Sequence, residues 1–333
     1  MGDATAVVLL GSCTPPLRWP LRDTPPALAP IANRAVLAHQ IEALARLGIG
    51  QIAVAGDATS AERAQQALRS AGVDPETVPY VSLGAINGRV PLAPAANYFA
   101  ADSPLVLIEP GTLPGPDLAK VLDRVRRDPR KAVIVSLHTG DEIGPRTRVL
   151  ATVVGSSALS ALADADASAH LTSGGIAETL RRQGLRPLEW STRGSWLKIE
   201  RAESLLEANR VHLDLLAAGD SAAFAKRADV QGAVIVDETA TLDYSTVRGP
   251  AIIGAGAFVA DSHIGPYTSI GADAVIEDAE TESCIVCSSA IIRELRARLQ
   301  DSVIGSSAVV TQEPQGPRAL RLTVGEDARI SLP

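Results

Sequence analysis

A repeat of 17 residues in the C-terminal third is the feature that most limits what this chain can fold into. Three sets of residues recur at this spacing: Val236, Ile253 and Ile270; Leu242, Val259 and Ile276; Ala240, Ala257 and Ala274. Each repeat divides into blocks of five or six residues, in which a small residue follows four positions after an aliphatic one. This is the periodicity of hexapeptide parallel β-helices, where aliphatic residues fill the bore and small residues fit tight corners. Ile304-Gly305 and Val324-Gly325 predict later, interrupted coils.

The part of the chain before this repeat alternates strand-like and helix-like segments. Apolar runs predict strands at 6–10, 51–55, 78–82, 105–108 and 131–137, and amphipathic segments predict helices at 34–47, 60–71, 93–101 and 116–127. Such alternation indicates a mainly parallel, three-layered α/β domain. A further helix is expected at 201–218, and Gly219 opens a linker. We therefore predict an α/β domain over 1–219 and a β-helix domain over 220–333.

The first strand is followed by a proline-rich irregular segment and then by the first helix. A strand, a loop and a helix in this order bring backbone N–H groups to phosphate in α/β proteins. Asn33 stands directly before the helical segment, where we expect it to act as the N-cap. Parallel sheets bind ligands beyond the carboxyl ends of their strands. The segment that begins at Gly11 is therefore the first candidate for a binding site.

Several short motifs in this chain resemble one family closely. They are Leu17-Arg18, Pro20-Leu21, Pro30-Ile31-Ala32-Asn33 and the run from Leu205 to Arg210. The chain resembles the sugar-1-phosphate nucleotidyltransferases, in particular the long form of glucose-1-phosphate thymidylyltransferase, which carries the same C-terminal appendage. The resemblance covers nearly the whole chain. It implies a Rossmann-like nucleotidyltransferase domain followed by a left-handed parallel β-helix of hexapeptide repeats.

The phosphate-binding motifs of that family are degenerate in this sequence. Where the family has Gly-Gly-x-Gly-Thr-Arg, the second and third glycines are Ser12 and Thr14 and the arginine position is Pro16. The family's Pro-Lys-Pro has become Pro25-Pro26-Ala27, without the lysine. Prolines donate no N–H and fix φ where glycine would be free. The candidates for a degenerate phosphate loop are Gly11, Ser12, Thr14, Arg18 and Arg22. For the two arginines, exposed surface contacts are the plainer alternative.

The family's two magnesium-binding aspartates are also replaced. Pro110 stands where the first is expected after the strand 105–108, and Ile199 stands at the position of the second. Glu109 and Glu200, each one residue away, are candidates for displaced metal ligands. A shift by one residue along a strand turns the side chain to the opposite face of the sheet, which argues against them. The family's sugar-binding Glu-Lys-Pro has no counterpart in 138–146. No catalytic residue is assigned, and Mg²⁺ is expected as a cofactor only if the protein is active.

Two functions of different classes follow from these observations. The first is a nucleotidyltransferase-like protein that has lost the NDP-sugar pyrophosphorylase reaction. It would act as a regulatory, scaffold or repurposed-site protein in sugar-nucleotide or natural-product metabolism. The second is an active glucose-1-phosphate thymidylyltransferase, which joins a nucleoside triphosphate to a sugar 1-phosphate and releases pyrophosphate. Losing one charge-stabilising group commonly costs about 10²–10³ in rate, and several are missing here, so the first function is favoured.

Composition limits the compartment and the partners. The net charge of −7 argues against a nucleic-acid partner, and no apolar run is long enough to span a membrane, so we expect a cytoplasmic protein. The three cysteines make no disulfide framework, and Cys284-x-x-Cys287 is predicted to be a reduced structural pair rather than a zinc site. The expected partners are a second copy of the chain, an active nucleotidyltransferase paralogue or pathway enzyme, and a nucleotide or sugar phosphate.

Overall fold

The computed structural model describes residues 4–11, 21, 24–82, 84–85, 90–99, 103–141, 144–166, 168–192, 196–216, 227–312, 319–320 and 322–332. The chain forms two compact units. The first comprises 1–14, 25–28 and 35–199, and the second comprises 15–24, 29–34 and 200–333. The predicted boundary between 219 and 220 lies in the segment 217–226, outside the described residues, and it stays a prediction.

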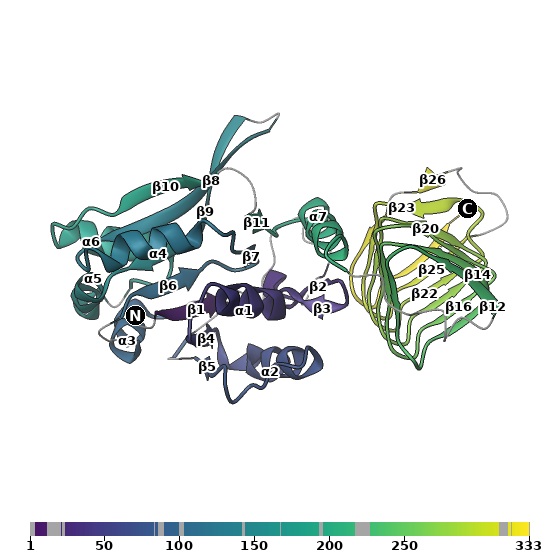
Figure 1. Cartoon of the computed structure of the whole chain (residues 1–333), viewed down its shortest axis with the longest axis horizontal. Helices are drawn as coiled ribbons and strands as arrows, with labels where there is room; N and C mark the ends of the chain where they lie inside the picture. Colours follow the sequence, from purple (N-terminus) through teal and green to yellow (C-terminus); the bar gives the residue numbers. More distant parts are fainter. Residues whose placement is uncertain are drawn as a thin grey trace. The chain divides into compact units, whose positions relative to one another are not determined.

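A seven-stranded sheet forms the centre of the first unit, in the order β10-β8-β9-β6-β1-β4-β5 (Figure 1). Its strands are β1 Thr5–Leu9, β4 Gln51–Ala55, β5 Tyr80–Val81, β6 Leu105–Ile108, β8 Ala132–Asp141, β9 Gly144–Val154 and β10 Leu188–Thr192. Neighbouring strands are parallel, except that β9 is antiparallel to both β6 and β8. The predicted mainly parallel α/β sheet is therefore confirmed.

Helices cover both faces of this sheet. They are α1 Val36–Arg46, α2 Ala61–Ser70, α3 Leu92–Tyr98, α4 Leu118–Arg126, α5 Ser156–Ala161 and α6 Ser173–Arg182. Ala6 and Val8 of β1 belong to the core that contains residues of α1, α2 and α4, whereas Val7 and Leu9 belong to the core with α3, α5 and α6. Because alternate residues of a strand face opposite sides, β1 is buried on both faces. The predicted three-layer arrangement is confirmed.

The C-terminal strands of the second unit form a parallel β-helix. They are β12 Arg227–Gln231, β13 Val234–Val236, β14 Thr241–Arg248, β15 Ala251–Ile253, β16 Phe258–Ala260, β17 His263–Ile264, β18 Thr268–Ile270, β19 Val275–Glu277, β20 Glu280–Glu282, β21 Ile285–Val286, β22 Ile291–Arg293, β23 Arg298–Gln300, β24 Val303–Ile304, β25 Val309–Gln312, β26 Ala319–Leu320, β27 Thr323–Val324 and β28 Arg329–Leu332. They pair in parallel, each with the corresponding strands of the coils on either side (Figure 1).

The β-helix has three faces, named A, B and C. Face A is the sheet β13-β15-β18-β21-β24-β27. Face B runs from the first half of β14 through β16, β19, β22 and β25 to β28, and face C runs from the second half of β14 through β17, β20 and β23 to β26. The strand β14 pairs with β16 through 241–243 and with β17 through 246–247, so one strand serves both face B and face C.

The strand register confirms the repeat predicted from the sequence. On face A, Val236, Ile253 and Ile270 stand in line, and the ladder continues through Val286 and Ile304 to Val324. All six belong to the apolar core of the helix. The spacing departs from 17 only after Ile270, which is the predicted interruption of the later coils. The small residues Ala240, Ala257 and Ala274 are buried in the same core, as expected for tight corners.

The expectation that Asn33 caps the first helix is wrong. The strands β2 (Pro30–Ile31) and β3 (Arg34–Ala35) form a hairpin whose two-residue turn, Ala32 and Asn33, has φ of 45° and 59°. Turns of this kind need positive φ at both positions, which asparagine tolerates better than most residues. The helix α1 begins after Ala35, whose side chain makes no capping hydrogen bond. Asparagine favours both caps and turns, so the sequence alone did not separate the two.

Two short strands, one further helix and the 3-10 helices Pro26–Leu28, Ala58–Ser60 and Leu162–Asp164 are the other elements of the described chain. The strands β7 (Thr112–Leu113) and β11 (Leu197–Lys198) form a small antiparallel ladder in the first unit. The helix α7 (Ala202–Leu213) belongs to the second unit. Among the described residues, no helix has the length and hydropathy needed to cross a membrane.

Candidate functional site

The carboxyl ends of β1 and β6 lie side by side in the first unit, and the chain leaves them at Gly11 and Glu109. Gly11 has a φ of +83°, which favours glycine. A Cβ atom placed on Gly11 would lie 2.9 Å from Cβ of Pro110. The ring of Pro110 therefore packs directly on the backbone where the phosphate-binding loop of the family begins. A side chain at Gly11 would be both strained and in collision with this ring.

The structure brings together the two segments in which the family carries its metal-binding aspartates. In the β7–β11 ladder, Leu197 pairs with Leu113 and Lys198 with Thr112. Directly after this ladder, the N–H of Ile199 donates to the carbonyl of Gly111 at 2.8 Å. The segments that carry Pro110 and Ile199 therefore lie next to each other. Ile199 is completely buried. Neither side chain carries an oxygen atom, so neither can hold Mg²⁺, which binds oxygen ligands.

The lysine beside these positions is held by the protein itself. Nζ of Lys198 donates to the carbonyl of Pro110 at 2.8 Å and lies 3.1 Å from Oγ1 of Thr112. These contacts tie β11 to the end of β6. They give the ammonium group a structural role directly after β6.

Glu109, a candidate for a displaced metal ligand, is engaged with helix α6. Its Oε1 accepts from the backbone N–H of Ser173 at 2.8 Å and from the hydroxyl of Ser173 at 2.6 Å. The hydroxyl of Thr152 is 2.6 Å from the same Ser173 oxygen. A carboxylate at the N-terminus of a helix is stabilised by the helix dipole and by unpaired N–H groups. This contact explains a glutamate at 109 without a metal.

Glu200, the other candidate, lies at the entrance to α7 in the second unit. Its backbone N–H donates to the hydroxyl of Ser204 at 3.0 Å, and its side chain is half-buried. In the described part of the chain, no group of three or more His, Cys, Asp or Glu side chains is arranged to hold a metal ion. The pairing of Glu109 with Glu200 around a metal stays a prediction. Ser12, Thr14, Arg18 and Arg22 of the candidate phosphate loop lie outside the described residues.

Two of the motifs that carried the family resemblance, 30–33 and 205–210, meet in the second unit, although no local pattern in the sequence indicates it. Asn209 of α7 is buried, and its Oδ1 accepts from the N–H of Ala32 at 2.8 Å and from the hydroxyl of Ser269 at 2.7 Å. Its Nδ2 donates to the carbonyl of Tyr267 at 3.2 Å. Nδ2 of Asn33 donates to the carbonyl of Ile270 at 2.6 Å. The two asparagines therefore join the β2–β3 hairpin, α7 and one coil of the β-helix.

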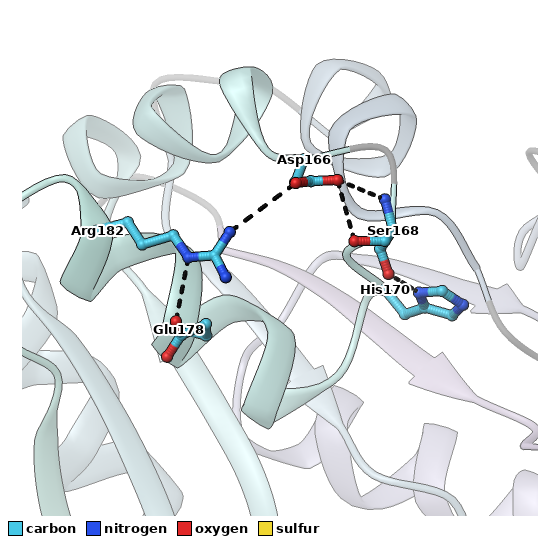
Figure 2. Close-up of polar contacts among 5 residues, drawn as sticks. All are labelled: Asp166, Ser168, His170, Glu178 and Arg182. Atoms are coloured by element: carbon cyan, nitrogen blue, oxygen red, sulfur yellow. Dashed lines mark hydrogen bonds and ion pairs between the residues drawn. The ribbon is translucent and has the colours of Figure 1, made fainter.

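A group of charged side chains stands before and along α6, as Figure 2 shows. A carboxylate oxygen of Asp166 accepts from the N–H and the hydroxyl of Ser168 at 2.9 and 3.0 Å, which lowers the pKa of Asp166 below its usual value. Arg182 lies 3.1 Å from Glu178 and 3.9 Å from Asp166. Nδ1 of His170 is 2.7 Å from the carbonyl of Ser168. These contacts are exposed and order the turn ahead of α6, and they form no enclosed site.

The two cysteines of the β-helix are free and buried, in agreement with the predicted reduced pair. Burial raises the pKa of Cys284 and of Cys287 to about 12. Sγ of Cys284 is 3.1 Å from the carbonyl of Glu282. A neutral, buried thiol is neither a nucleophile nor a metal ligand, so these cysteines contribute to packing only.

Comparison with known proteins finds similarity to two nucleotidyltransferases. No family model matches the chain. It is 37% identical over 139 residues to a glucose-1-phosphate thymidylyltransferase of Streptomyces griseus and 34% identical over 139 residues to one of Streptomyces antibioticus. Each match covers 42% of this chain and 39% of the relative, so the likeness spans less than half of either protein. Through these homologues, the chain is related to the sugar-1-phosphate nucleotidyltransferases.

Proposed function

We propose that this protein does not carry out the NDP-sugar pyrophosphorylase reaction and acts instead through contacts with other protein subunits. It would serve as a regulatory or scaffold protein in sugar-nucleotide or natural-product metabolism. The observation that carries the proposal is the pair Pro110 and Ile199 at the positions of the metal-binding aspartates. The hydrogen bond between Ile199 and Gly111 holds the two segments together with no side-chain oxygen from either position.

Three further features support this proposal. The carboxylate of Glu109 accepts two hydrogen bonds at the start of α6. The ammonium of Lys198 is engaged with the chain's own oxygen atoms. The ring of Pro110 packs on Gly11, just after β1. Nucleotidyl transfer develops negative charge on phosphate oxygens, and cations stabilise that charge. The described residues at this edge do not fit a magnesium ion.

The experiment is an assay of pyrophosphate release from dTTP and glucose 1-phosphate in the presence of Mg²⁺. The enzyme of Streptomyces griseus, a thymidylyltransferase by name, is the positive control. We expect no release above background from this protein. Turnover of even about 1 s⁻¹, the low end for typical enzymes, would contradict the proposal.

The identity to two named thymidylyltransferases favours a second candidate, an active glucose-1-phosphate thymidylyltransferase. Calorimetric titration with dTTP, glucose 1-phosphate and dTDP-glucose separates the candidates further. Binding of all three with release of pyrophosphate supports the second candidate. Binding of one ligand without turnover points to a repurposed site that retains a nucleotide or sugar phosphate.

A further inference from the structure

The outward residues of the β-helix differ from face to face. On face C the outward residues Thr246, His263 and Glu280 lie in register and are polar, and Arg298 of the next coil forms an ion pair with Glu280. On face A the outward column contains Ile285 and Val303, which lie in register, lie outside the core of the bore and are at most 1% exposed. Face C is therefore polar. On face A, Ile285 and Val303 are covered, whereas Ile252 of the same column is half-buried and Ile235 is 37% exposed.

The helix α7 lies against part of face A. Ser269, in the same outward column, donates its hydroxyl to Asn209 of α7. A pocket of about 240 Å³ is lined by α7 residues, including Leu206, together with Ser283 and Asp301 of the β-helix. The chain's own helix thus lies beside the coils that carry Ser269, Ser283 and Asp301.

Face B carries a longer apolar column that remains partly exposed. Its members lie in register and alternate with core residues of the bore: Phe258, Val275, Ile291 and Val309. Each is half-buried, in contrast to Ile285 and Val303. Beside this column runs a second one that includes Glu277 and Arg293. An apolar ladder on a flat sheet face is typical of a surface that packs against another sheet.

We propose that face B binds the same face of a second copy of this chain, about a two-fold axis that runs along the strands between β19 and β22. Such an axis places each column of one copy against the same column of the partner, with the coils of the partner in the reverse order. It places Val275 opposite the partner's Ile291 and Phe258 opposite the partner's Val309. These four apolar side chains then meet apolar side chains, while Thr241 and the partner's Arg329, at the two ends of the same column, stand opposite each other.

The charges on face B fit the same axis. Glu277 and Arg293 stand in adjacent coils and form an ion pair of 2.6 Å, with 36% and 46% of their side chains exposed. The axis places Glu277 opposite the partner's Arg293, and Arg293 opposite the partner's Glu277. Each charge therefore meets the opposite charge, and four charges form one network across the interface. If the two copies instead packed with their coils in the same order, the apolar column of one copy would lie against the charged column of the other.

The area of face B sets the affinity that we expect for the dimer. Three residues along a strand and six strands across the face give an area of about 10 Å by 29 Å in projection. This is smaller than a standard interface of about 800 Å² per partner. A dimer that forms with rising concentration in the micromolar range is therefore expected, rather than an obligate one.

The test is sedimentation equilibrium of the full chain between about 1 and 200 µM, with two charge reversals and one control. Glu277→Arg makes the central pair wholly positive, and Arg293→Glu makes it wholly negative. We expect each variant alone to weaken the dimer by about tenfold or more, because like charges then face each other. An equimolar mixture of the two variants should dimerise again, since every facing pair is then opposite in sign. Arg298→Glu breaks comparable ion pairs on face C and should leave the dimer unchanged.

Four results would overturn the proposal: a wild-type mass of 34.6 kDa throughout, an Arg293→Glu variant that associates like the wild type, a mixture no stronger than its components, or an equal effect of Arg298→Glu. If a charge variant melts well below the wild type, Val275→Ser replaces it and should also weaken the dimer. The outcome is independent of the proposed function, because a dimer through face B is compatible with an active or an inactive α/β unit and pyrophosphate release is measured separately.

Discussion

Two regions of the molecule differ in how they compare with the family that the chain resembles. One is the edge of the α/β sheet where β1 and β6 end, called the strand-end edge. The other is the set of contacts made by Asn33 and Asn209 in the second unit, called the junction. At the strand-end edge the two segments are joined by a backbone hydrogen bond, and Pro110 and Ile199 stand where the resemblance implies metal-binding aspartates. At the junction, Asn33 and Asn209 remain, and their amide groups make four hydrogen bonds to surrounding chain segments. The asparagines that join segments match the family's motifs, whereas Pro110 and Ile199 do not match its metal-binding positions.

This difference has a physical basis. A buried amide such as Asn209 satisfies backbone groups that no apolar side chain can satisfy, so its replacement costs folding free energy. A metal-binding aspartate repels other negative charges at an empty site, so its loss need not destabilise the fold. Ile199 adds apolar burial to its position. Loss of ligand binding is therefore compatible with a stable protein, whereas loss of the junction is not.

The largest effect is expected in the bore of the β-helix. Ile264→Asp would place an unpaired carboxylate at a completely buried position and should lower the free energy of unfolding by more than about 4 kcal/mol. His263→Asp, the neighbouring outward position, is the matched control and should cost less than about 1 kcal/mol. Urea unfolding followed by circular dichroism measures both. Similar losses in the two variants would contradict the alternation of inward and outward residues.

The next largest effect is expected at the junction. Asn209→Ala leaves the N–H of Ala32 and the hydroxyl of Ser269 without their acceptor, and it should cost about 2–3 kcal/mol. Glu207→Ala, at an exposed position of the same helix, should change the free energy of unfolding by less than about 0.5 kcal/mol. Thermal unfolding of both variants tests this. A tolerated Asn209→Ala change would remove the structural reason for keeping the motif.

A further prediction concerns the dependence of stability on pH through the two buried thiols. Burial raises the pKa of Cys284 and of Cys287 to about 12, above the value near 8.5 of an unfolded chain. The unfolded chain therefore loses its thiol protons first. The stabilisation is complete below about pH 8.5 and is lost as the pH rises toward 12, by up to about 1.4 kcal/mol per pH unit for each thiol. Comparing urea unfolding of the wild type and Cys284→Ala/Cys287→Ala between pH 8 and 10 measures this slope. An equal slope in both proteins would contradict it.

Much of the fold could be predicted from the sequence because its periodicities are strong. The step from Val236 to Ile253 to Ile270 reports a strand register directly, since each coil repeats the same backbone geometry. The buried strand at 105–108 was predicted with its observed bounds because all four residues are apolar. Asn33 was misassigned because asparagine is favoured both at helix caps and in turns with positive φ.

The candidate site was less predictable, because its side chains are placed by contacts distant in sequence. The replacement of both aspartates was visible in the sequence. That Glu109 is held by Ser173, 64 residues away, was not. Nor did any local pattern indicate that Asn209 reaches Ala32, since the two are separated by 177 residues. Such contacts depend on the topology of the sheet and of the coils.

The smallest effect, and the sharpest test of the strand-end edge, is expected from Glu109. If this carboxylate only stabilises the start of α6, Glu109→Gln keeps the shape and loses the charge, and it should cost about 1 kcal/mol. Addition of Mg²⁺ should then leave the melting temperature of the wild type unchanged, because a ligand stabilises only a protein that binds it. Glu178→Gln, which changes a carboxylate in an exposed ion pair later in α6, is the control and should cost less than about 0.5 kcal/mol. If instead Mg²⁺ raises the melting temperature of the wild type but not of Glu109→Gln, then Glu109 is a metal ligand. The contrast between an eroded edge and an intact junction would then have to be given up.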